Sequence, residues 1–211
     1  MLKKFGKFEV RDLVEDSHNH LEEFSYAKLF GDIDFNVCCA GKVQQPVVLP
    51  LSRWLDGEKD RLKKMQFIVP NYMLEAGGGG EFKRDVNVGK RLYIVVEFDF
   101  KDESVPIEKR LAWQVRLLWH LREKWPLAMV VYSGSKSLHG WFACFHADEH
   151  RIRTFFRMAT GLGADRQMIV PSQYCRMPWG TNYKTGRRQA VVFFNSELIR
   201  KHNQLVQEVC A

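Results

Sequence analysis

The chain has 211 residues, of which 45% are hydrophobic and 13% aromatic, so it can bury a well-packed core. Its 32 lysines and arginines outnumber its 25 aspartates and glutamates, and the formal charge of +7 favours a polyanionic partner such as nucleic acid. No apolar run approaches the roughly 20 residues that a membrane helix needs, and the polar start lacks the apolar part of a secretion signal. We therefore expect a cytoplasmic protein with no membrane partner.

The cysteines indicate neither a disulfide framework nor a zinc ribbon, because the 5 of them are odd in number and include no CxxC pair. A zinc site made of Cys144, His146, His150 and Cys175 is a less favoured alternative, since this spacing is loose compared with known zinc sites.

The first part of the chain has few periodic signals and is interpreted as short helices and strands. A charged helix is expected after Pro50-Leu51-Ser52, and a short strand at residues 66–69. Consecutive glycines from Gly77 to Gly80 carry no side chains to pack, so a flexible glycine-rich loop is expected here.

From Arg91 onward the signals are stronger. The run RLYIVVEFDF, residues 91–100, predicts a buried strand because it is rich in β-branched and aromatic residues. Apolar side chains at helical spacing predict a helix from Pro106 to Trp125. The later expected elements are strands at 127–132 and 138–145, a helix from Asp148 to about 160, short strands at 169–170, 173–176 and 190–194, and a final helix capped by Ser196.

This order of elements predicts an α+β fold: an open mixed sheet of the RNA-recognition-motif kind, with helices packed on one face. The expected organisation is an N-terminal αβ subdomain (1–75), a glycine-rich loop (76–90) and a catalytic subdomain (91–211), which together form one domain.

Two acids end the most β-prone run of the chain. Glu97 and Asp99 are two residues apart on a strand, so both carboxylates would point to the same face while Phe98 faces the core. Such a pair could bind two Mg²⁺ or Mn²⁺ ions, or it could simply lie where the strand reaches solvent.

A second constellation follows the strand at 127–132. The loop Ser133-Gly134-Ser135-Lys136-Ser137 offers small residues, backbone N–H groups and one ammonium, which suit a phosphate, although it is not a P-loop. Ser137 and His139 would share a face of the next strand. A histidine in a strand is more often structural, but this position favours a phosphate donor.

Two further groups complete the candidates. Asp165 stands where a helix is expected to return to the sheet, and it could be either a third metal ligand or a turn residue. Residues 176–188 interleave cations with aromatics, which suits a triphosphate and single-stranded nucleic acid, or alternatively a basic surface hairpin.

These motifs together resemble a known family. VEFD, SGSKSLHGWF, the aspartate of GLGAD and RMPWGTNYKTG are similar to the archaeo-eukaryotic primase superfamily, especially the primase-polymerases of plasmids, phages and other mobile elements. Acid-X-acid, Ser-X-His and a third acid form the active site in that family, and their order and spacing agree here.

The resemblance implies a nucleotidyl-transfer site with two Mg²⁺ or Mn²⁺ ions. The implied metal ligands are Glu97, Asp99 and Asp165, the implied nucleotide-binding residues are Lys136, Ser137, His139, Arg176 and Lys184, and His139 is counted with the acids among the catalytic residues. The implied activity is template-dependent transfer from an NTP or dNTP to a 3′-hydroxyl with release of pyrophosphate, in DNA replication or repair. The implied partners are a single-stranded DNA template with its primer, and a helicase or accessory primase domain.

Two other functions stay open. A metal-dependent nuclease or replication initiator can share a related sheet, although the sequence has neither the paired-histidine motif nor the helical tyrosine of strand-cleaving initiators. A non-catalytic RNA-recognition-like module would carry aromatics on its central strands in place of Glu97 and Asp99.

Overall fold

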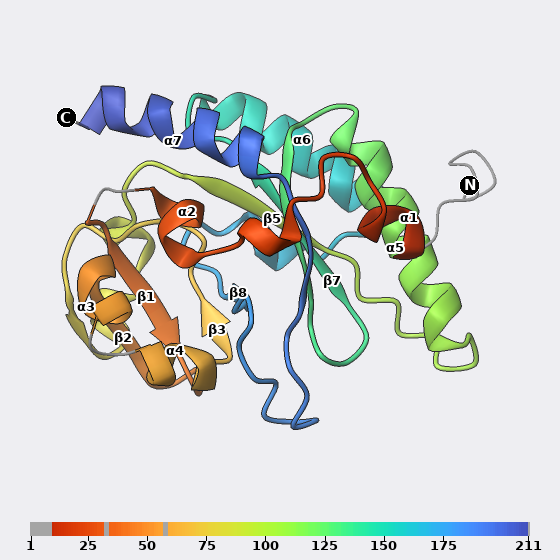
Figure 1. Cartoon of the computed structure of the whole chain (residues 1–211), viewed down its shortest axis with the longest axis horizontal. Helices are drawn as coiled ribbons and strands as arrows, with labels where there is room; N and C mark the ends of the chain where they lie inside the picture. Colours follow the sequence, from red (N-terminus) through yellow and green to blue (C-terminus); the bar gives the residue numbers. More distant parts are fainter. Residues whose placement is uncertain (1–9, 32–33, 57–58, 211) are drawn as a thin grey trace.

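The computed structural model describes residues 10–31, 34–56 and 59–210, which form two sheets with helices packed around them (Figure 1). The helices are α1 Val10–Val14, α2 Tyr26–Phe30, α3 Leu51–Asp56, α4 Lys59–Lys64, α5 Ile107–Arg122, α6 Glu149–Gly161 and α7 Ser196–Cys210, and short 3₁₀ turns are η2 Leu21–Glu23, η3 Gly80–Phe82, η4 Asp85–Asn87 and η5 Arg166–Ile169. The strands are β1 Asn36–Ala40, β2 Pro46–Pro50, β3 Phe67–Ile68, β4 Gly77–Gly78, β5 Tyr93–Glu97, β6 Leu127–Tyr132, β7 Leu138–Ala143, β8 Cys175–Arg176 and β9 Val191–Phe194.

The strands form one sheet in the order β4-β2-β1-β3-β8 and a second in the order β5-β7-β6-β9. The expected α+β class is confirmed, but the strand directions differ from the expected mixed sheet, because every named strand pair in the described part of the chain is antiparallel. The helix α5 connects β5 to β6, which run in the same direction, and β7 lies between these two strands as the antiparallel partner of both.

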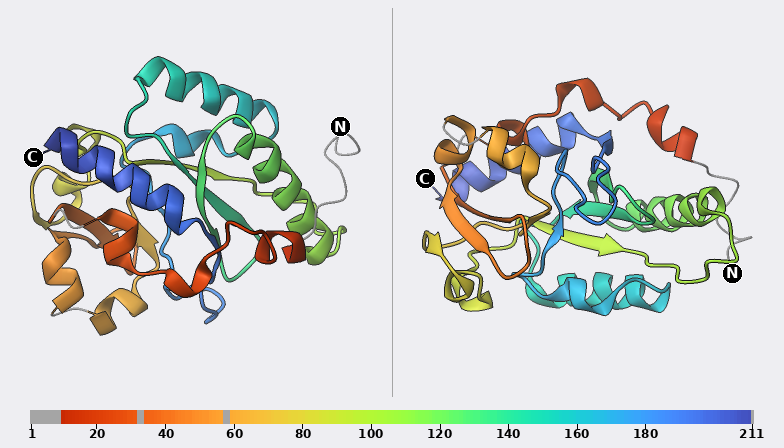
Figure 2. Two further views of the ribbon diagram at one scale, coloured as in Figure 1. Left: turned by 45° about the horizontal axis from the view of Figure 1, so that its top comes forward. Right: turned by 90° about the horizontal axis from the view of Figure 1, so that it is seen from below.

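Helices cover both faces of the second sheet, so the expectation of helices on one face is wrong. On one face, Phe155 of α6 packs against Phe142 of β7, with ring centroids 5.0 Å apart. On the other face, His202 of α7 lies 5.0 Å from the ring of Tyr93 in β5. Figure 2 (right) shows α6 and α7 on opposite sides of β5. Both faces of β5 and β7 carry apolar side chains, so each face needs a layer of helices to cover it.

The glycine-rich segment has more local structure than the expected loop. Gly77 and Gly78 form β4, which pairs with Val47 and Val48 of β2, and η3 and η4 follow. A β-carbon on Gly77 would lie 2.3 Å from the ring of Phe82. The absence of side chains is therefore what allows this segment to pack closely.

The two sheets are connected through β8. Its residues Cys175 and Arg176 come from the third expected segment of the chain, but they pair with Ile68 and Phe67 of β3 in the first sheet. One apolar core extends from Leu13 through both sheets to α7. The expected division of the chain into the segments 1–75, 76–90 and 91–211 stays a prediction. None of the described helices is both long and apolar enough to cross a bilayer.

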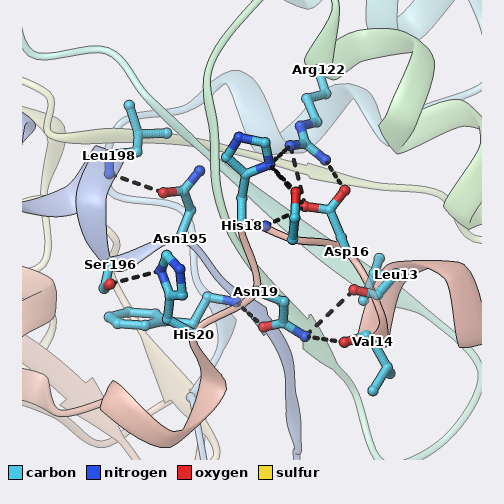
Figure 3. Close-up of polar contacts among 12 residues, drawn as sticks. Leu13, Val14, Asp16, His18, Asn19, His20, Arg122, Asn195, Ser196 and Leu198 are labelled. Carbon is cyan, nitrogen blue, oxygen red and sulfur yellow. Dashed lines mark hydrogen bonds and ion pairs between the residues drawn. The ribbon is translucent and has the colours of Figure 1, made fainter.

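Most elements predicted after Arg91 are present, with two local corrections. Residues 169–170 do not form a strand, because η5 extends to Ile169. Ser196 is the first residue of α7 and not its cap: the side chain of Asn195 accepts a hydrogen bond from the Leu198 N–H at 2.9 Å, as drawn in Figure 3. Asn195 therefore satisfies one of the free N–H groups that begin a helix.

The segment before η2 covers the edge of β9 (Figure 3). The amide of Asn19 accepts a hydrogen bond from the Phe194 N–H at 3.0 Å and donates to the Val192 carbonyl at 3.2 Å, so one side chain replaces part of a neighbouring strand. Asp16 is paired with Arg122 of α5 at 2.9 Å. These contacts protect a strand edge that would otherwise expose backbone groups.

Candidate active site

The register between β5 and β7 brings Glu97 beside His139. The two residues are direct cross-strand partners, so their side chains point to the same face of the second sheet. Nε2 of His139 lies 3.4 Å from Oε1 of Glu97, and the two side chains are 3% and 21% exposed. This distance is longer than that of a good hydrogen bond.

The carboxylate of Glu97 is held ionised. Burial by itself would raise its pKa, but interactions with His139, a hydrogen bond from Ser137 and the charge of Arg176 outweigh burial and lower the pKa to about 2. At neutral pH the site therefore contains a largely buried negative charge that a cation can approach.

Arg176 brings a positive charge to the same place from the other sheet. It is half-buried in β8, and its guanidinium lies 5.1 Å from the centre of the Phe67 ring. Burial lowers its pKa, and the charge of Glu97 opposes that effect. Nη1 has no hydrogen-bond partner among the described residues. A buried guanidinium with an unused donor is suited to bind an anionic ligand.

Side chains from both sheets line one cavity of about 260 Å³. Its charged and titratable lining includes carboxylates, cations and the buried histidine: Lys83, Glu97, His139, Asp165, Tyr174, Cys175 and Arg176. Acids and cations that face one another across a cavity are the arrangement that a metal-bound phosphate requires.

Asp165 lines this cavity from beside the edge of β5 that does not pair with β7. Its backbone N–H donates to the Glu97 carbonyl at 2.9 Å, which fixes the residue beside the end of that strand. Its side chain caps η5 by accepting a hydrogen bond from the Gln167 N–H at 3.0 Å. The residue therefore caps a turn, which was one of the two alternatives, and it also lines the cavity, whereas its role as a metal ligand stays a prediction.

Asp99 is placed differently. The strand β5 ends at Glu97, two residues before Asp99, and Phe98 between them is fully buried, as expected. Its Oδ1 is 2.8 Å from Nζ of Lys136, with the two side chains 33% and 42% exposed. Neither residue belongs to the cavity lining. The structure thus pairs a predicted metal ligand with a predicted phosphate ligand.

The serine-rich loop is closed by hydrogen bonds within the loop. Ser133 Oγ accepts hydrogen bonds from the N–H groups of Ser137 at 3.0 Å and Ser135 at 3.3 Å. Gly134 turns the chain with a φ of 72°, a conformation that favours glycine. The sequence had suggested that the N–H groups of this loop are free to bind a phosphate, but these two are not. The Ser137 side chain instead helps to lower the pKa of Glu97.

The segment after β8 packs on this loop. Asn182 donates to the Ser133 carbonyl at 2.8 Å, and Trp179 adopts a φ of 56° that is rare for a residue with a side chain. Lys184 is exposed, and it is outside the cavity lining. Arg176 and Lys184, predicted as one nucleotide-binding group, therefore have different surroundings.

Lys83 and Tyr174 line the cavity but were not predicted from the sequence. Nζ of Lys83 lies 4.3 Å above the ring of Tyr174, and burial lowers the pKa of this lysine. No carboxylate among the described residues lies within ion-pair distance of Nζ. The only local signal was a basic residue three positions after the last glycine of the run, Gly80.

The described ranges contain no three His, Cys, Asp or Glu side chains gathered closely enough to form a ready-made metal site. The zinc alternative of Cys144, His146, His150 and Cys175 is therefore not supported. The cavity instead presents the carboxylates of Glu97 and Asp165. This donor set fits Mg²⁺, which proteins often hold through one or two carboxylates together with phosphates of the substrate.

Comparisons with known proteins address the fold. No protein-family model and no curated protein matches the chain. Among solved structures, the AEP domain of the cyanophage S-2L primase-polymerase is similar over 93% of this chain and 98% of its own, at 19% identity and a TM-score of 0.52. The primase RepB′ aligns over 87% of this chain and 61% of its own at 15% identity, and its TM-score of 0.42 is too low to support an inference. The chain therefore shares the fold of that primase-polymerase AEP domain.

Proposed function

We propose that this protein is a DNA primase and polymerase: a template-dependent nucleotidyltransferase that joins an NTP or dNTP to a 3′-hydroxyl and releases pyrophosphate. The observation that carries the proposal is the cavity that is lined by the ionised carboxylate of Glu97 and by the side chains of Asp165, Arg176 and Lys83. The fold of a primase-polymerase domain supports the same reaction class, although fold by itself does not determine chemistry.

Glu97 and Asp165 are the residues that would hold divalent ions at this cavity, with Asp99 as the third proposed ligand. When bound, Mg²⁺ or Mn²⁺ would lower the pKa of the attacking hydroxyl and offset charge on the phosphates. Asp99 has to leave Lys136 before it can serve, and the side chains of this pair are exposed enough for that exchange to be inexpensive.

The chain's own residues would bind and orient the nucleotide. In the transfer, a bond forms between the 3′-oxygen and the α-phosphorus, and the bond to pyrophosphate breaks, so negative charge grows on the leaving group. Arg176 and Lys83 supply positive charge where the cavity would hold that group. The His139 ring has no hydrogen-bond partner at Nδ1 among the described residues, which leaves it available to a phosphate oxygen.

The remaining roles are also proposals. Lys136, Ser137 and Lys184 would contact the triphosphate or its surroundings, and a single-stranded template with its primer would follow the basic face near residues 181–188. The cytoplasmic location and a helicase or accessory primase partner stay predictions from the sequence.

The test is a primer-synthesis assay on single-stranded DNA with labelled nucleotides and Mg²⁺ or Mn²⁺. We expect product from the wild type, and a loss of at least about 100-fold for Glu97→Gln and Asp165→Asn, the usual scale for removal of a charge that stabilises a transition state. Glu123→Gln removes an exposed carboxylate at the end of α5 and serves as the control.

The same assay separates the alternatives. If no template, with or without a primer, gives product, the polymerase proposal is lost. Shortening of the labelled primer would identify a nuclease, and DNA binding without any product would indicate a binding module.

A further inference from the structure

We infer that Gln114 of α5 is a positioning residue for the Ser137–His139 arm of the site, an inference that rests on the proposed nucleotide-transfer function. Gln114 is fully buried, although glutamine is a residue that usually lies at the surface. Its helix packs against β7. A buried amide requires hydrogen-bond partners. Both partners of Gln114 are backbone groups at the point where the serine-rich loop enters β7.

The amide of Gln114 binds the loop at two points on either side of Ser137. Nε2 donates to the Lys136 carbonyl at 2.9 Å, and Oε1 accepts from the Leu138 N–H at 2.6 Å. One donor and one acceptor on a rigid planar group therefore satisfy both outward-facing backbone groups next to Ser137. A methylene chain of the correct length is needed, since the two contacts must form at once.

The opposite side of the same short segment is bound by Ser133. The Ser137 N–H donates to Ser133 Oγ, and the Ser137 carbonyl accepts from the Ser133 N–H at 2.9 Å. Four hydrogen bonds thus surround one residue, two from Gln114 and two from Ser133. Gln114 and Ser133 together fix the backbone around Ser137, and thereby the position from which its side chain extends.

This restraint matters because the segment leads directly into β7, where His139 follows Ser137 by two residues. His139 is the cross-strand partner of Glu97, with Nε2 3.4 Å from Oε1, and the Ser137 side chain helps to lower the pKa of Glu97. A helix on one side of the sheet thereby controls groups on the other side. Misplacement of binding groups by about 1 Å can lower rates by about 100-fold.

The test compares Gln114→Met, which keeps the volume but removes both hydrogen bonds, with Leu121→Ala, which leaves a cavity elsewhere in α5. Leu121 is fully buried and lies seven residues after Gln114, near the end of the same helix. We expect Gln114→Met to raise the KM for the nucleotide about tenfold, equivalent to about 1.4 kcal/mol, with template affinity unchanged. Hydrogen exchange of the peptide 133–139 should also become faster in this variant.

Leu121→Ala should lose stability without either effect. The inference is overturned if Gln114→Met and Leu121→Ala show the same KM and the same exchange at 133–139. Gln114→Glu offers a second measurement, because it keeps the acceptor for Leu138 but places a carboxylate oxygen against the Lys136 carbonyl, and we expect no rescue. A wild type that makes no product would defeat the proposed function, whereas normal wild-type activity with an unaffected Gln114→Met would defeat only this inference.

Discussion

Replacement of Glu97 by glutamine should make the protein less stable at neutral pH and remove part of its acid sensitivity. The folded-state pKa of Glu97 is lowered from 4.5 to about 2, so the ionised form is favoured by the surrounding residues despite burial. At about 1.4 kcal/mol for each tenfold change, this corresponds to a stabilisation on the order of 3 kcal/mol. Glutamine has nearly the same shape but cannot carry the charge.

The sign of the pH dependence follows from the direction of the shift. Because the folded-state pKa lies below 4.5, the stabilisation is complete above about pH 4.5 and is lost as the pH falls toward 2. Urea unfolding of the wild type and Glu97→Gln at several pH values measures the difference. We expect a gap on the order of 3 kcal/mol at pH 7 that closes between about pH 4.5 and 2.

Comparison of the two proteins at each pH cancels the titration of the other acids, because those groups are present in both. A gap that is equally large at about pH 2 and pH 7 would show that glutamine disturbs packing and would refute the electrostatic reasoning. A variant more stable than the wild type at pH 7 would show that burial outweighs the favourable contacts.

Three further changes test other parts of the molecule. Lys83→Ala should raise the KM for the nucleotide while Lys124→Ala, at an exposed position, should not; equal KM values would remove Lys83 from the site. Lys136→Ala should change the free energy of unfolding by less than about 1 kcal/mol, since its ion pair with Asp99 is partly exposed, and it should lower the rate of nucleotide incorporation; a large loss of stability would contradict this. Asn19→Ala should destabilise the protein by about 1–3 kcal/mol in urea unfolding, because it removes the partner of the Phe194 N–H and of the Val192 carbonyl, and an unchanged midpoint would show that water replaces the side chain.

Local patterns were sufficient to predict much of the fold after Arg91. The run before Glu97 became β5, and the helical spacing after Pro106 became α5, because hydrophobic periodicity is a property of neighbouring residues. Asp148 caps α6 through the Arg151 N–H as expected. The same patterns did not show which face each helix covers, since that depends on contacts between distant segments.

The site was predictable only within single strands. Alternation predicted that Ser137 and His139 share a face, but it did not predict that Glu97 lies on that face too, because this depends on the pairing of β5 with β7, two strands that are far apart in the chain. Asp99 lies beyond the last residue of β5, and that its carboxylate shares the face of Glu97 stays a prediction. Beyond Glu97 the carboxylate of Asp99 meets Lys136, a partner that no local pattern identifies.

The part that local reasoning could not supply is the contribution of the first sheet. Arg176 faces Glu97 because β8, although it comes late in the chain, pairs with Phe67 and Ile68 of β3 in the first sheet. Lys83 reaches the cavity because the glycine segment packs tightly beside β2. Acids from one sheet and cations from the other therefore meet at the contact between the sheets. Loss of that contact should weaken nucleotide binding even where every side chain of the cavity is retained, and Gly77→Val, which places a side chain against Phe82, is a direct way to measure this with the same KM assay.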